Sequence, residues 1–236
     1  MRALFLAHDP GSRPGLVGDA LARRGFDIEV LAMARSIHDG TWDGRFPRAD
    51  AADLLVPLGA IFSLNDRSQV GDWIDAELEL LRDADRAGIP VLGICFGGQA
   101  LAAAHDGEVV AADAAQIGWS TVDTDDPSLV PSGPWMQWHT DRFVVPPAAK
   151  ELARDASCPQ AFVLRRNLGV QFHPEVDEAG IAHWLELAGP DGEVAAEAAG
   201  TSTQQLLADA RANAERASRN VETLVDAFLS EVAGLA

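Results

Sequence analysis

Cysteine, basic side chains and long apolar runs are all scarce in this chain of 236 residues. Two cysteines are too few for a disulfide framework, which indicates a reducing compartment, and we expect a cytoplasmic location. Lys and Arg number 18 against 36 acidic side chains, leaving a formal charge of −18. This acidic excess argues against a nucleic-acid-binding face and against docking on anionic lipid. The first apolar run, residues 3–7, is too short for a signal peptide or a membrane span.

The chain is long enough to bury a sizeable core, and its hydrophobic share of 47% is that of a globular protein. Through the first 110 residues, short apolar runs alternate with helical patterns, which is typical of a parallel sheet covered on both faces. We expect strands over 3–7, 28–33, 54–56 and 90–94, and helices over 15–24 and 70–87.

From about residue 108 to residue 172 the pattern changes to shorter strands separated by turn signals. The strands expected there are 108–112, 118–124, 135–139, 143–145, 161–165 and 168–172. We expect this part to extend the sheet and to add an antiparallel patch. The predicted fold class is therefore α/β, with an open, mostly parallel sheet between two layers of helices.

The last part of the sequence indicates a different organisation from the parts before it. After a helix over 178–187, Gly189-Pro190-Asp191-Gly192 predicts a turn, and Ser202 with Gln205 forms a capping-box signature. A long helix over 203–233 should follow, so we expect a domain over 1–188 and a linker with a helix over 189–236. The apolar spacing of this helix fits either a homodimer contact or a helix folded back on its own domain.

A candidate nucleophile stands in the segment Gly93-Ile94-Cys95-Phe96-Gly97, between an apolar strand and a helix. This is the thiol form of a nucleophile elbow, in which the glycines allow a tight turn that exposes the middle side chain. The start of the helix would favour a thiolate at Cys95, and the N–H of Phe96 would face a developing oxyanion. A buried cysteine in a glycine-rich turn is the alternative interpretation.

A second motif, Gly169 to Glu175, ends another apolar strand and carries His173. A cysteine nucleophile needs a base to handle its proton and a third group to orient that base. Because His173 and Glu175 are two residues apart on a strand end, both side chains can point the same way.

These two motifs, in this order and separation, resemble the class I (triad) glutamine amidotransferases, and the opening of the chain is most similar to stand-alone members related to the GMP synthetase glutaminase domain. The resemblance covers about residues 1–188. It implies that Cys95 is the nucleophile, that His173 is the general base and then acid, and that Glu175 orients His173. The oxyanion hole would consist of the N–H groups of Ala60 and Phe96.

The resemblance also implies a set of substrate contacts: Gly59, Gln99, Trp138, His139, Thr140 and Asp141. Three positions depart from the family pattern. Ala60-Ile61 replaces a usual Gly-Pro, Thr140 replaces a usual Gly, and Gln116 replaces a usual Glu. No catalytic group is removed, but the first two changes affect the regions expected to bind glutamine.

The resulting hypothesis is a glutaminase that releases ammonia for an acceptor on another protein, because the chain after residue 188 is too short for an ATP-using synthetase domain. One alternative is a γ-glutamyl hydrolase or peptidase, and another is a non-catalytic binding subunit. We expect no cofactor and no metal. His8, His38, His105 and His183 are interpreted as structural or surface residues, and Cys158 as a bystander.

Overall fold

The computed structural model describes residues 1–235. Within them, eight strands form one sheet in the order β2-β1-β3-β4-β10-β9-β8-β6. Strands β2, β1, β3, β4 and β10 are parallel, and β9, β8 and β6 continue the sheet in antiparallel pairs. Their bounds are β1 (Arg2–Ala7), β2 (Asp27–Ala32), β3 (Leu54–Pro57), β4 (Val91–Ile94), β6 (Asp123–Thr124), β8 (Lys150–Arg154), β9 (Pro159–Leu164) and β10 (Asn167–Val170).

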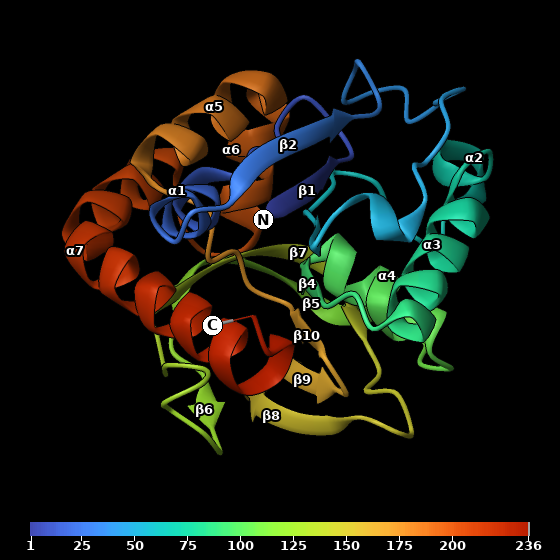
Figure 1. Ribbon diagram of the computed structural model, residues 1–236. Coiled ribbons are helices and arrows are strands. Elements are labelled where there is room, and N and C mark those ends of the chain that lie inside the picture. Colours follow the sequence, from blue (N-terminus) through green and yellow to red (C-terminus); the bar gives the residue numbers. More distant parts are fainter. Residues whose placement is uncertain (236) are drawn as a thin grey trace.

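Helices cover both faces of this sheet (Figure 1). Side chains of β1 alternate between the faces: Phe5 packs in one core with α1 (Gly15–Arg23) and α7 (Thr203–Ala227). Leu4 and Leu6 pack in the other core, with α3 (Ile74–Ala87) and α4 (Phe96–Ala104). Full burial of such a side chain contributes about 1.5–3 kcal/mol, so both layers stabilise the sheet. The predicted α/β fold class is confirmed.

A smaller two-stranded sheet lies apart from the main one. Strands β5 (Val109–Ser120) and β7 (Trp135–Phe143) are antiparallel, and Met136 joins a third apolar cluster with residues of α5 (Glu178–Ala188), α6 (Pro190–Ala198) and α7. The remaining short helices are η1 (Ala49–Ala51) and α2 (Arg67–Val70). The expected antiparallel patch is thus present, but most of it forms a separate sheet.

Several local predictions were wrong. Residues 190–198 form helix α6 where a turn was expected, because Gly189 adopts φ +55° just before the helix and Pro190 fits the first helical turn. Strand β8 was not predicted, and the segments 108–112 and 118–120 belong to one long strand, β5. The helix expected over 70–87 begins at Ile74, after the separate turn of α2.

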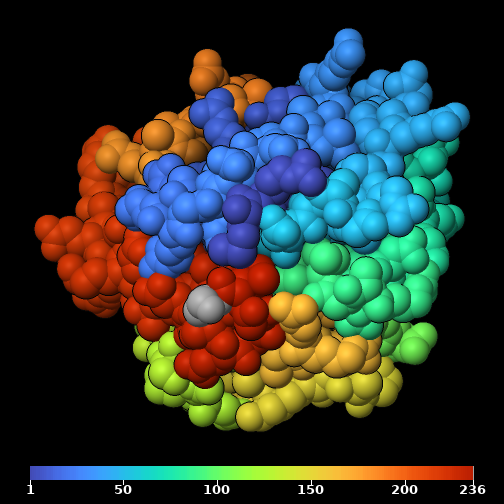
Figure 2. Space-filling model, in the orientation of Figure 1, coloured from blue at the N-terminus to red at the C-terminus, as the bar shows by residue number. Residues whose placement is uncertain are grey.

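The long C-terminal helix is confirmed, since α7 continues directly into a π-helical segment, η2 (Phe228–Ala233). Its residues Val221, Leu224 and Phe228 are buried in the core that also contains α1. The helix therefore folds back on its own domain, and the space-filling view shows its red residues against the blue N-terminal part of the chain (Figure 2). A homodimer through this helix stays a prediction.

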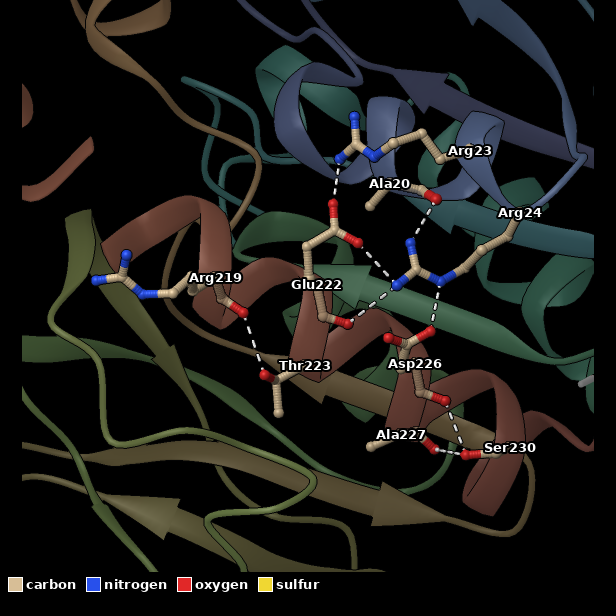
Figure 3. A network of polar contacts seen from close by, with 9 residues as sticks. All are labelled: Ala20, Arg23, Arg24, Arg219, Glu222, Thr223, Asp226, Ala227 and Ser230. Carbon is tan, nitrogen blue, oxygen red and sulfur yellow. Dashed lines mark hydrogen bonds and ion pairs between the residues drawn. The ribbon is translucent and has the colours of Figure 1, made fainter. Parts of the chain in front are cut away.

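Ion pairs fix α7 on α1 (Figure 3). The Arg24 guanidinium donates to Asp226 at 2.6 Å and lies 2.7 Å from a Glu222 carboxylate oxygen, while Arg23 also pairs with Glu222. These pairs lie at the edge of the contact and orient a helix whose burial supplies most of the stabilisation. None of the helices in residues 1–235 has the length and apolar character needed to cross a membrane.

Candidate functional site

Cys95 lies in a sharp turn between β4 and α4. Its backbone has φ 50° and ψ −108°, a conformation that residues other than glycine rarely adopt. The neighbouring glycines make the turn fit: a Cβ on Gly97 would lie 2.0 Å from the Pro57 carbonyl oxygen, and one on Gly98 would lie 2.5 Å from that of Val170. The sequence around Cys95 therefore adopts the strand–turn–helix geometry of a nucleophile elbow.

His173 and Glu175 follow β10, the parallel neighbour of β4, and form a buried pair. The His173 Nδ1 and a Glu175 carboxylate oxygen are 2.7 Å apart. The other ring nitrogen, Nε2, is buried and has no hydrogen-bond partner within residues 1–235. The ring is thus oriented through one nitrogen, and the second nitrogen is free for proton transfer.

The electrostatics of this pair involve Cys95 as well. Burial alone would lower the pKa of His173, but the negative charges of Glu175 and Cys95 raise it well above its ordinary value. This direction favours a protonated His173 ring. The arrangement brings together the elements that nucleophilic catalysis needs: a thiol, a group that can carry a proton and a carboxylate that orients that group.

A loop over residues 58–63, directly after β3, forms the next wall of the site. Gly59 faces the pair, because a Cβ built there would lie 2.7 Å from His173 Cε1 and 3.7 Å from Cys95 Cβ. Within residues 1–235, neither the Ala60 N–H nor the Phe96 N–H donates a hydrogen bond. The two amides predicted to form an oxyanion hole therefore have no protein acceptor.

The other five residues predicted to contact substrate lie on α4 and β7. Gln99 donates its amide N–H to the Asp141 carbonyl at 3.0 Å, and Ser63 donates its hydroxyl to the Asp141 carboxylate. His139 lies 3.0 Å from the same carbonyl. Burial, with the charge of His173, lowers the pKa of His139 to about 4, so His139 is neutral at pH 7.

These elements enclose a cavity of about 340 Å³. All eleven residues of the predicted catalytic, oxyanion and substrate sets line it: Gly59, Ala60, Cys95, Phe96, Gln99, Trp138, His139, Thr140, Asp141, His173 and Glu175. The structure thus brings together residues of α4 and β7 with residues that follow β3, β4 and β10, although these segments are far apart in the chain.

The sequence interpretation missed contributors to this cavity, among them residues of α5 and α6. Trp184 on α5 packs edge-on against His173, with ring centroids 4.8 Å apart, and against Trp138 at 5.7 Å. The first turns of α6, including Asp191, close the far end. No local signal could have found them, because Trp184 is an ordinary apolar position of an amphipathic helix and α6 was expected to be a turn.

The other singled-out residues lie elsewhere or serve different contacts. Burial raises the pKa of the Cys158 thiol to about 12, which makes it unreactive at neutral pH. His105 and His183 contact backbone carbonyls, at 3.0 Å each. His8 is buried beside Glu77, behind the 58–63 loop. Within residues 1–235, no group of three or more His, Cys, Asp or Glu side chains could hold a metal ion.

Comparison with known proteins gives a consistent picture. A profile of the family described as glutamine amidotransferase class-I matches residues 18–182. The chain is 39% identical to the GMP synthase (glutamine-hydrolyzing) of Synechococcus sp. over 168 residues, which are 67% of this chain and 30% of that protein. It is 37% identical to the GMP synthase of Clostridium botulinum over 132 residues, 52% of this chain and 25% of that protein. The chain therefore spans less than a third of these curated relatives.

Two solved structures match nearly the whole chain. The crystal structure of a glutamine amido transferase from Methylobacillus flagellatus has a TM-score of 0.83 and 26% identity, covering 98% of this chain and 94% of that chain. A glutamine amidotransferase from Thermotoga maritima has a TM-score of 0.82 and 21% identity, covering 98% and 99%. At 21% identity, the second likeness shows a shared fold alone.

Proposed function

This chain belongs to the class I glutamine amidotransferase family, and from that premise we propose that it hydrolyses the side-chain amide of glutamine and releases ammonia for an acceptor on another protein. The observation that carries the proposal is the meeting of an elbow cysteine with a buried His–Glu pair whose Nε2 is open to it. In the proposal, Cys95, His173 and Glu175 are the catalytic residues.

The reaction follows from this geometry. The Cys95 thiolate attacks the amide carbonyl carbon, and the oxygen takes the negative charge beside the N–H groups of Ala60 and Phe96. His173 gives its Nε2 proton to the departing nitrogen, so that ammonia leaves and a γ-glutamyl thioester remains. Water then attacks the thioester while His173 accepts its proton, and glutamate leaves as the thiolate returns.

A second candidate is hydrolysis of a γ-glutamyl amide that carries an apolar substituent on nitrogen. His173 protonates the leaving group, so the leaving group must lie on the side of the cavity that His173 faces. Trp184 packs against His173 there, and Leu187, Ala188 and Ala195 continue the same wall. An apolar wall next to the leaving group offers favourable burial to an alkyl or aryl amine, which ammonia does not need.

One assay tests both candidates. The protein is incubated with glutamine and with γ-glutamyl amides of alkyl and aryl amines, and release of ammonia or amine is measured. Release from glutamine that disappears in Cys95→Ala, but persists in the matched variant Cys158→Ala, supports the first candidate. Release from the substituted amides alone supports the second. Absence of turnover, together with absence of Cys95 labelling by an electrophilic glutamine analogue, would overturn both.

A further inference from the structure

Side chains that the proposed reaction does not use hold the 58–63 loop. His8 and Glu77 are buried behind it, whereas Asp9 and Ser12 also line the cavity. The Gly59 carbonyl oxygen accepts a hydrogen bond from the Ser12 hydroxyl at 2.8 Å and lies 3.3 Å from His8 Nδ1. Two residues further on, the Ile61 N–H donates to the Asp9 carboxylate at 2.7 Å. The peptide groups on both sides of Ala60 are therefore fixed by the segment that follows β1.

His8 must be doubly protonated to make its contacts. Its Nε2 lies 3.0 and 3.1 Å from the two carboxylate oxygens of Glu77, and its Nδ1 faces the Gly59 carbonyl. Both nitrogens face acceptors, and a neutral imidazole has only one N–H to donate. Burial alone would lower the pKa of His8, but the charge of Glu77 raises it. The ion pair is fully buried, so loss of either partner would leave an uncompensated charge in the interior.

The orientation of one peptide group follows from these contacts. A trans peptide is planar, so the C=O of Gly59 and the N–H of Ala60 point in opposite directions. Because the carbonyl is turned toward His8 and Ser12, the Ala60 N–H is turned away from them, and it donates to no acceptor within residues 1–235. No proline restricts this stretch of backbone, so side-chain contacts must determine which way the peptide faces.

We propose that His8, Asp9, Ser12 and Glu77, here called the loop clamp, are positioning residues that keep the Ala60 N–H directed at the oxyanion of the reacting carbonyl. The inference rests on the proposed function for its chemistry. In this inference the buried His8–Glu77 pair supports catalysis through the loop and does not itself contact substrate. An unclamped Gly59–Ala60 peptide could rotate and present its carbonyl oxygen, which would repel the developing negative charge.

Two reactions of Cys95 distinguish a role in directing the Ala60 N–H from a role in forming the Cys95 thiolate. Alkylation by iodoacetamide forms an Sγ–C bond as iodide leaves, and no oxyanion develops. Acylation by 4-nitrophenyl acetate forms a thioester through a tetrahedral oxyanion and releases 4-nitrophenolate. A clamp variant should slow the second reaction and not the first, whereas loss of the thiolate would slow both. Neither probe requires recognition of glutamine, so the test holds even if the proposed substrate is wrong.

The first variant is Ser12→Ala, at a partly exposed position. It removes the hydroxyl contacts with the Gly59 carbonyl and, at 3.3 Å, with the Asp9 carboxylate, without burying a new charge. We expect acylation, and kcat for the true substrate, to fall about tenfold, with KM and the alkylation rate changed less than about twofold. Ser12→Thr, which keeps the hydroxyl, should restore most of the rate. The double variant His8→Gln/Glu77→Gln should lose about 100-fold in acylation. Ser230→Ala, which removes an exposed hydroxyl bond on the C-terminal helix, is the matched control.

Each outcome decides the inference. Slower acylation with unchanged alkylation in Ser12→Ala supports the loop clamp, even if the wild type releases nothing from glutamine, in which case only the proposed function fails. Equal rates in Ser12→Ala and the wild type, or equal losses in acylation and alkylation, would overturn it. A wild type that is alkylated but not acylated would overturn it as well, because no amide would then be directed at the oxyanion.

Discussion

Two buried His–Glu pairs touch the 58–63 loop, and they differ in what is left unpaired. In the His173–Glu175 pair, Nε2 and one carboxylate oxygen have no partner within residues 1–235. In the His8–Glu77 pair, both ring nitrogens and both carboxylate oxygens are engaged. The first pair can therefore still exchange a proton with a ligand. In the second pair, every nitrogen and oxygen atom of the two side chains already has a partner.

A buried His–Glu pair does not by itself indicate whether the pair serves catalysis or positions the backbone. Both histidines are buried, which would lower their pKa, and both have a raised pKa because the charges and hydrogen bonds of their partners together outweigh the effect of burial. The distinguishing feature is what the second ring nitrogen faces: the cavity with Cys95 for His173, and the Gly59 carbonyl for His8. One pair suits chemistry, and the other suits positioning.

The largest expected effect comes from replacing the histidine of the pair that lines the cavity. His173→Gln removes the proton carrier, and we expect kcat for amide hydrolysis to fall about 10⁴-fold. The double variant His8→Gln/Glu77→Gln should lose only about 100-fold, since it misaligns one oxyanion donor. Steady-state kinetics measures both, with circular dichroism to verify folding. Losses of equal size in the two variants would contradict the division of roles.

Replacing one glutamate at a time should separate the two pairs in kcat. Glu175→Gln weakens the orientation of His173, and we expect kcat to fall about 10³-fold, whereas Glu77→Gln should lower kcat by at most about 100-fold. Each variant leaves a buried imidazolium without its counter-ion, so unfolding should become easier by about 3 kcal/mol in both. Urea titration and ammonia release on the same preparations give the two numbers. A larger loss of kcat in Glu77→Gln than in Glu175→Gln would show that the two pairs have been assigned the wrong way round.

A third histidine, His139, differs from His8 in how it should make the free energy of unfolding depend on pH. His139 has a folded pKa of about 4, so between that value and about 6.5 the unfolded state binds a proton that the native state does not. Stability should therefore fall as the pH falls through this window, by up to about 3 kcal/mol. His8 has a raised pKa, so its contribution is present below about pH 6.5 and is lost as the pH rises through its folded pKa.

Urea unfolding at several pH values tests this difference in sign. His139→Gln should flatten the acid side of the stability profile relative to the wild type, while a His8 variant should change the alkaline side. The carboxylates common to all variants cancel in the comparison. An unchanged acid slope in His139→Gln would show that His139 is protonated in the native state.

The smallest effect is expected at an exposed pair. Arg24→Ala removes the contacts of Arg24 with Glu222 and Asp226 in Figure 3 and leaves the Arg23–Glu222 pair in place. These carboxylates are partly solvated, so the free energy of unfolding should fall by only about 0.5–1 kcal/mol, or roughly 2 °C in Tm. Differential scanning calorimetry at low and high salt measures it. A loss as large as that in Glu77→Gln would contradict the assumption that burial determines the strength of these pairs.

The features that could be predicted from sequence are those that depend on residues close to one another in the chain. The parallel strands β1 and β4 are continuous apolar runs, Cys95 is flanked by glycines, and His173 and Glu175 are two residues apart. The long helix α7 has a capping serine, Ser202, whose hydroxyl accepts from Gln205. In each case local spacing determines the structure.

The features that were missed depend on distant residues. His8 and Glu77 are 69 positions apart, and only the packing of α3 beside β1 brings them together. Trp184 reaches the cavity because α5 docks beside His173, which helical periodicity does not indicate. Strand β8 is partly polar and gains its identity from pairing with β9. The expected division of the chain at residue 188 stays a prediction.

The contact between α1 and α7 has a consequence for synthesis on the ribosome. The apolar face of α1 is completed by Val221, Leu224 and Phe228, which are translated about 200 positions later. At about 5–20 residues per second, the first helix waits ten seconds or more with this face uncovered. The nascent chain thus exposes this apolar face until its last helix emerges, and slow codons before residue 203 would lengthen that exposure.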